Sequence, residues 1–101
     1  MLNDLMGKFQ EAQNKMEESK KNLNTKFVEL ELENGKIKVQ ANGNKRLTNI
    51  TISEDLLNDN EALEDLLITA VNKVLEKSEE LFDSEMQNVA GGMLSGMNGL
   101  F

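Results

Sequence analysis

Residues 28–46, VELELENGKIKVQANGNKR, decide how the middle of this chain folds. Two Asn-Gly pairs, at 34–35 and 42–43, follow segments in which apolar and polar residues alternate. Such alternation predicts β-strands, because successive side chains of a strand point to opposite faces of the sheet. The stretch is therefore a strand hairpin or, if its glycines opened a helix, a phosphate-binding loop.

The first Asn-Gly pair predicts a tight hairpin tip. A type I′ turn needs positive φ at both central residues, which Asn tolerates and Gly adopts freely. This tip matches the two strands in polarity and in charge, with the pairs Glu33–Lys36, Leu32–Ile37, Glu31–Lys38 and Leu30–Val39. A shift of one residue would break every pair. Because strand follows turn here, the phosphate-loop interpretation is weak.

A third strand is predicted in the segment LTNITIS, where Thr48, Ile50 and Ile52 are expected to share a face. The connection to it is longer than a two-residue turn, and a simple register would set Arg46 against Val39. We therefore expect a bulged or irregular connection. The three strands form an antiparallel meander with one apolar face.

Two long amphipathic helices flank this meander, at residues 2–26 and about 60–90. The first carries a seam with alternating steps of three and four, at Leu2, Leu5, Phe9, Ala12, Met16, Ser19 and Leu23. Such a seam suits either a core stripe within the chain or a contact between subunits, and the sequence leaves both open.

The order of elements predicts an α+β fold, α-β-β-β-α, with a three-stranded antiparallel meander and two long helices. We expect one domain over residues 1–90 and a flexible Gly/Met-rich tail over residues 91–101, where four of the seven glycines lie. Two long helices leave surplus apolar surface on so small a body, which favours a homodimer.

Composition argues against an enzyme. The chain contains no Cys and no His, so a thiol nucleophile, an imidazole base and an ordinary zinc site are excluded. The acidic residues around positions 55–65 lack the spacing of a calcium loop and suit the start of a helix. We expect no catalytic residue, metal, cofactor or small-molecule substrate.

No apolar run reaches the length of a membrane span, and the first residues lack the pattern of a secretory signal. A cytoplasmic protein without a membrane partner is therefore expected.

The net charge of −7 is unevenly distributed. Residues 1–26 and 27–46 carry +1 each, whereas residues 47–101 hold two Lys and eleven acidic residues and carry −9. A polyanion would have to meet the first half of the chain, with the acidic half turned away.

Many lysines of the first helix follow an acidic residue by four positions, in the pairs Asp4–Lys8, Glu11–Lys15 and Glu17–Lys21. Lys20 and Lys26 lack such a partner, and Lys45 and Arg46 are unmatched nearby. Taken alone, these charges indicate a solvated surface. No aromatic residue lies between them, so stacking on single-stranded bases is unsupported.

Three segments, IKVQANG, ISEDLL and EDLLITAVNKVLEK, resemble the YbaB/EbfC family of bacterial nucleoid-associated proteins in their order and intervals. The resemblance covers nearly the whole chain. It implies a homodimer whose long helices project from a joined sheet body. It also implies binding of duplex DNA, a change in DNA conformation, a location in the nucleoid, and roles in nucleoid organisation and transcription regulation.

Under this resemblance, the contacts are expected to be mainly to phosphates. The residues expected to make them are Lys15, Lys20, Lys21, Lys26, Lys45 and Arg46. An acidic dimeric protein-interaction module, or a chaperone-like adaptor without DNA binding, is the alternative, and it agrees with the pI of about 4.6.

Overall fold

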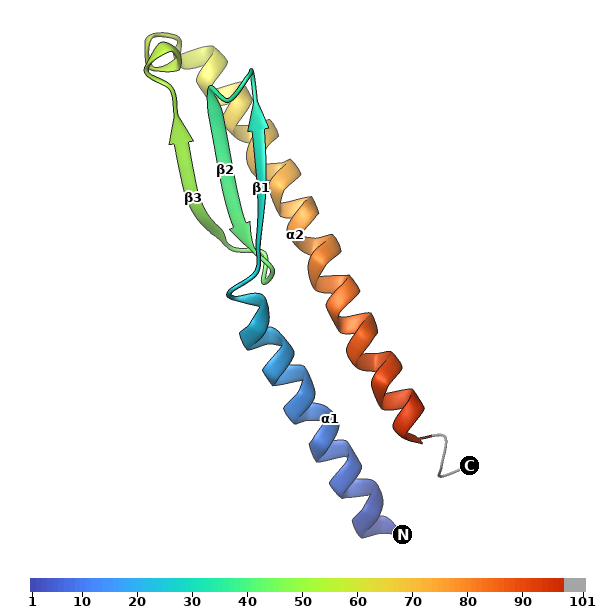
Figure 1. Ribbon diagram of the computed structural model, residues 1–101. Helices are drawn as coiled ribbons and strands as arrows, with labels where there is room; N and C mark the ends of the chain where they lie inside the picture. The colour runs from blue at the N-terminus through green and yellow to red at the C-terminus, as the bar shows by residue number, and fades with distance from the viewer. Residues whose placement is uncertain (98–101) are drawn as a thin grey trace.

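The computed structural model describes residues 1–97 and has the predicted α-β-β-β-α order (Figure 1). The elements are α1 (Leu2–Leu23), β1 (Phe27–Leu32), β2 (Ile37–Asn42), β3 (Leu47–Ile52), the 3₁₀ helix η1 (Glu54–Asn58) and α2 (Asn60–Met97). The molecule is elongated, measuring 67 × 18 × 16 Å. Helix α1 and the last turns of α2 run side by side beyond the sheet, and we call these two segments the arms.

The predicted β1–β2 register is confirmed. Leu30 pairs with Val39, and Leu32 pairs with Ile37, in an antiparallel ladder. The turn takes positive φ at three successive residues, Glu33, Asn34 and Gly35, so one more residue than expected adopts the left-handed conformation.

The predicted irregularity between β2 and β3 is also confirmed, but its position changes one face assignment. Gln40 pairs with Asn49, and the next pair is Ala41 with Leu47, so Thr48 is the extra residue of a bulge. The Thr48 hydroxyl donates to the Gln40 side chain at 2.8 Å, on the polar face of the sheet. The prediction that Thr48 shares a face with Ile50 is therefore wrong, because the bulge changes the alternation there.

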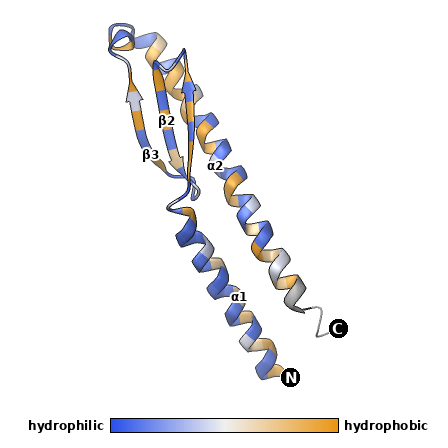
Figure 2. Cartoon of the chain, viewed as in Figure 1, coloured by the Kyte–Doolittle hydropathy of each residue, from blue (hydrophilic) through white to orange (hydrophobic). Residues whose placement is uncertain are grey.

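The core lies between the sheet and α2. Helix α2 packs across β1 and β2, while β3 lies at the outer edge of the sheet. The fully buried apolar side chains include Ile37 and Val39 from β2 and Val74 from α2. Figure 2 shows hydrophobic residues recurring along α2, as an amphipathic helix requires. On β3, Leu47 and Ile50 remain 40% and 42% exposed.

Both long helices differ from their predicted bounds. Helix α1 ends at Leu23, and residues 24–26 connect it to β1. Helix α2 continues beyond residue 90 to Met97. The mobility expected of residues 91–101 stays a prediction, and residues 98–101 lie outside the described part of the chain.

Candidate nucleic-acid interface

The end of α1 and the β2–β3 turn meet at a point that we call the waist, formed by residues 20–26 and 42–46. The Gly43 backbone N–H donates to the carbonyl oxygens of Leu23 and Lys26, both at 2.9 Å. These bonds satisfy a carbonyl at the end of α1 that has no partner within the helix. Two segments about twenty residues apart in the sequence are thereby fixed together.

Gly43 is needed there because of space. A Cβ atom built on Gly43 would lie 2.5 Å from Leu23 Cδ2 and 3.1 Å from the Leu23 carbonyl oxygen. Leu23 is itself completely buried. The backbone of the turn can approach α1 this closely only where no side chain intervenes.

Asn44 strengthens the same junction with its side-chain amide. This amide donates to the Lys20 carbonyl oxygen at 2.7 Å and to Asn24 Oδ1 at 2.5 Å. The amide of Asn44 thus connects the turn to the last residues of α1.

Ser78 attaches α2 to the waist from the other side. Its hydroxyl donates to the Asn42 carbonyl oxygen at 2.5 Å and accepts the Lys45 backbone N–H at 2.9 Å. The Ser78 side chain is fully buried, so its polar atom depends on these partners. The sequence analysis did not identify Ser78. Its position among the apolar residues of one face of α2 could have indicated a buried polar residue that needs hydrogen-bond partners.

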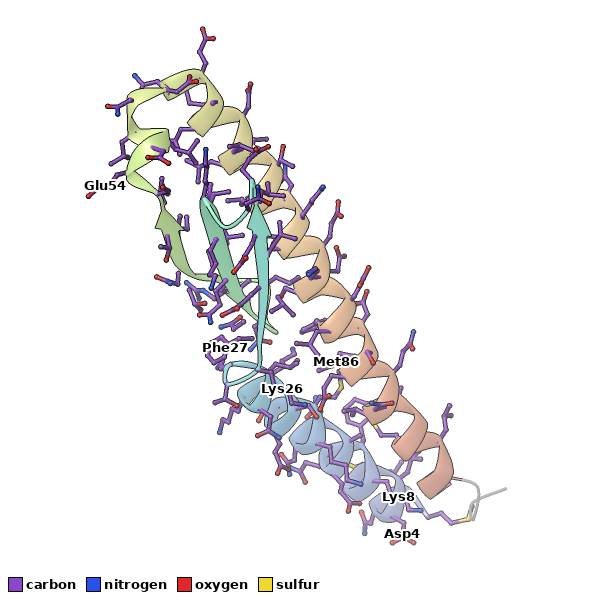
Figure 3. The ribbon with its side chains drawn as sticks, turned by 45° about the horizontal axis from the view of Figure 1, so that its top comes forward. Asp4, Lys8, Lys26, Phe27, Glu54 and Met86 are labelled. Carbon is purple, nitrogen blue, oxygen red and sulfur yellow. The ribbon has the colours of Figure 1, made fainter. Side chains whose placement is uncertain are left out.

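The waist brings together five of the six predicted DNA-contacting residues: Lys20, Lys21, Lys26, Lys45 and Arg46. Two of them have intramolecular partners that the sequence did not predict. Lys26 Nζ forms an ion pair with Glu85 at 3.2 Å. Figure 3 labels Lys26 and, on α2, Met86, which is the residue after Glu85. Lys45 Nζ lies 4.4 Å from the centre of the Phe82 ring, a cation–π distance.

The other basic side chains of the waist face solvent. Within residues 1–97, Lys20, Lys21 and Arg46 are exposed and make no side-chain ion pair or hydrogen bond. The same holds for Lys15, which lies farther along α1 beside the groove between the arms. The predicted helical pairs of Lys15 and Lys21 with Glu11 and Glu17 are therefore not formed in this structure.

Two acidic residues of α2 near the waist face away from it. The waist-facing side of α2 is defined by Ser78, Phe82 and Glu85. At 3.6 residues per turn, Glu80 and Asp83 lie on the opposite side of the helix. The only α2 carboxylate that the described ion pairs place at the waist, Glu85, is matched by Lys26.

Neither a cluster of metal-ligating side chains nor a membrane-crossing helix is found in the described part of the chain. Among residues 1–97, no three His, Cys, Asp or Glu side chains converge closely enough to hold a metal ion. Nor does either long helix, over the same residues, combine the length and the apolar character that a membrane crossing requires. What the waist offers an incoming group is positive charge on exposed side chains.

The sequence profile of the YbaB/EbfC DNA-binding family matches residues 1–93. The chain therefore belongs to this family, which is a DNA-binding family and not an enzyme family.

Two similar proteins are both named nucleoid-associated proteins. The one from Ruminiclostridium cellulolyticum is 38% identical, over 99% of this chain and 88% of its own length. The one from Flavobacterium johnsoniae is 36% identical, over 99% of this chain and 97% of its own. The crystal structure of an uncharacterized protein from Helicobacter pylori has the same fold, with a TM-score of 0.78 at 23% identity, covering 93% of this chain and 97% of that one.

Proposed function

We propose that this chain is a nucleoid-associated protein that binds duplex DNA, with the waist as its contact surface. The observation that carries the proposal is the joining of Lys20, Lys21 and Arg46, all exposed, on a chain of this family. Lys15 extends the basic surface along α1, and Lys26 and Lys45 add charge at its centre.

The contacts are mainly to phosphates, because most protein–DNA hydrogen bonds go to phosphate and sugar, and exposed lysine and arginine side chains supply them. Sequence preference is accordingly weak. Each neutralised phosphate contributes about −0.9 to the slope of log K against log salt concentration, so four contacts per chain give a slope of roughly −3.6. By holding a duplex at several phosphates, the protein alters DNA conformation, and through it nucleoid organisation and transcription.

The test is fluorescence anisotropy with a short labelled duplex, titrated with protein at several salt concentrations. We expect affinity to fall steeply with salt, and Lys20→Glu with Lys21→Glu to weaken binding at least tenfold and flatten the salt slope. The single substitution Lys20→Glu has Lys36→Glu as its charge-matched control, because Lys36 is exposed at the β1–β2 tip, at the other end of the sheet. The Lys36→Glu variant should bind much more like the unmodified protein.

An affinity that ignores salt, or equal losses in Lys20→Glu and the Lys36 control, would contradict the waist as the DNA surface. Recovery of proteins but no DNA in pull-downs, unaltered by nuclease, would favour the protein-interaction alternative instead.

The functional unit in this proposal is a homodimer joined through β3. Because α2 covers β1 and β2, the inner face of β3 is left with Leu47 and Ile50 about two-fifths exposed. An edge strand also presents unpaired backbone groups to a neighbour. A second copy on this edge would cover both features and place two waists in one particle.

A further inference from the structure

The two arms enclose an open apolar groove at the end of the molecule away from the sheet. Its volume is about 860 Å³. Leu5, Phe9 and Met16 of α1 line one side, and Met93 and Leu94 of α2 line the other. The α1 side of the groove is the heptad seam that the sequence left open between a role within the chain and a role between chains.

The structure shows how little of this seam α2 covers. Leu23, at the waist end of the seam, is completely buried. Toward the free end, Leu5 and Phe9 are 52% and 67% exposed, and Leu94 on the facing helix is 66% exposed. The seam therefore serves the chain's own core only near the waist, and its free end retains apolar surface for a further helix.

The charge of the groove limits what that helix can be. Residues 1–16 contain two lysines and two acidic residues, and residues 86–97 contain no charged residue. The arm ends therefore have no net side-chain charge, although the chain carries −7. Lys8 and Lys15 are balanced in number by Asp4 and Glu11, so the groove has no net attraction for a strongly charged partner, and its main contact surface is apolar.

We propose that the occupant is the arm of a second copy, packed end to end and antiparallel, so that the four arm helices form one bundle. Each copy presents both the groove and the amphipathic α1 that fits such a groove, as a two-fold contact requires. The antiparallel arrangement keeps the acidic sheet ends of the two copies apart, whereas a parallel one would bring them together. Antiparallel helices with apolar seams are the usual form of a four-helix bundle.

This arm contact is separate from the β3 contact and does not depend on DNA binding. The sheet and the arm ends lie at opposite ends of a molecule 67 Å long. A protein with both contacts joins dimers to one another. If the waist binds DNA as proposed, the arm contact holds two duplexes in one assembly.

The test measures the mass of the full chain over a concentration series by sedimentation velocity. We expect the unmodified protein to form an assembly that Leu5→Glu with Phe9→Glu does not form. High salt should preserve or strengthen this assembly, because an apolar contact is not screened. Asn14→Glu is the matched control: Asn14 is exposed on the same helix, does not line the groove, and should leave the assembly intact. Equal masses for the double variant and the unmodified protein at all concentrations would overturn the proposal.

A second measurement covers the case in which the charged variant folds poorly. The chain has no Cys, so a single Phe9→Cys reports on the contact alone. A short thiol crosslinker should join Phe9→Cys chains into covalent pairs far more efficiently than Asn14→Cys chains, and equal crosslinking would count against the contact. The double variant should still bind DNA as the unmodified protein does, and lose only the ability to hold duplexes bound to separate dimers in one assembly. If the unmodified protein does not bind DNA at all, the proposal that the waist binds DNA is refuted, but the proposed arm contact is not affected.

Discussion

Gly35 and Gly43 both follow an asparagine, yet they are required for different physical reasons. Gly35 has φ of 84°, a conformation that a side chain disfavours, and it turns β1 into β2. Gly43 lies against Leu23, and its lack of a side chain lets the second turn reach α1. The same dipeptide thus makes a hairpin at one end of the sheet and a junction between elements at the other.

Gly43→Ala should destabilise the protein by about 1–3 kcal/mol, because the new methyl group overlaps Leu23 and its carbonyl. Thermal unfolding followed by circular dichroism measures this as a fall in the melting temperature. Gly7→Ala is the matched control, since nothing lies within 4 Å of a Cβ there. Alanine in that helix should stabilise by roughly 0.5–1 kcal/mol. Equal melting temperatures for Gly43→Ala and the unmodified protein would contradict the close approach.

For individual residues, the sequence predicts those contacts that depend only on residues close to one another along the chain. The pairing of Leu32 with Ile37 followed from polarity and turn chemistry alone. The approach of Gly43 to Leu23 did not, and neither did the ion pair of Lys26 with Glu85, 59 residues away. Such contacts depend on how whole elements pack, which no local pattern encodes.

Among the elements, the hairpin of β1 and β2 has the clearest electrostatic signature. On its outer face, Lys38 Nζ lies 3.0 Å from Glu31 Oε1. The hydrogen bond that Lys38 donates to the Glu31 carboxylate is the main cause that raises the pKa of Lys38, followed by the charges of Glu31 and Glu29. The pair is exposed, so it supports register more than stability.

Glu31→Gln should lower the pKa of Lys38 toward its ordinary value of about 10.4. A lysine whose pKa is raised by folding stabilises the protein below that ordinary value, and this contribution is lost as pH rises through the folded value. The free energy of unfolding should therefore change with pH in the same way for the variant and the unmodified protein near neutral pH. Above about pH 10 the two dependences should differ. NMR titration of the Lys38 side chain measures the shift, with Lys36 as internal reference. An unchanged midpoint for Lys38 would show that Glu31 is not its partner in solution.

The lengths of the helices were harder to predict than their existence. Glycines at 91 and 92 suggested a tail, but α2 continues through both to Met97. Each glycine costs a helix about 1 kcal/mol. Extending an existing long helix needs no new nucleus, however, so two glycines near its end are tolerated more easily than propensity alone indicates.

For the whole molecule, the sequence indicated surplus apolar surface, and the structure shows two regions where part of it lies. One is the inner face of β3, where Leu47 and Ile50 are partly exposed. The other is the free end of the arms, where Leu5 and Phe9 are exposed. Composition can suggest that a chain has partners, but only the arrangement of α2 over the sheet shows where they would bind.

Ile50→Glu should weaken the proposed β3 contact and move the protein from dimer to monomer, because a charge would be placed on a face that becomes buried. Sedimentation velocity is best performed in the Leu5→Glu, Phe9→Glu background, so that the arms contribute nothing. Thr51→Glu is the control, since Thr51 is the next residue of β3 and points to the outer face. If both substitutions leave the dimer unchanged, β3 is not its interface.

Helix α2 spans sheet and arm without a break, whereas α1 is linked along the chain only through residues 24–26 and is otherwise held by non-covalent contacts such as the Gly43 and Asn44 hydrogen bonds. At about 1.5 Å per residue, the 38 residues of α2 form a rod of roughly 57 Å. Any widening of the gap between the free ends would therefore require α1 to rotate about residues 24–26, because α2 is packed on β1 and β2. The hydrogen bonds of Gly43 lie at residues 23–26. If the β2–β3 turn were loosened, the separation of the two arms would therefore increase at their free ends, far from the turn itself.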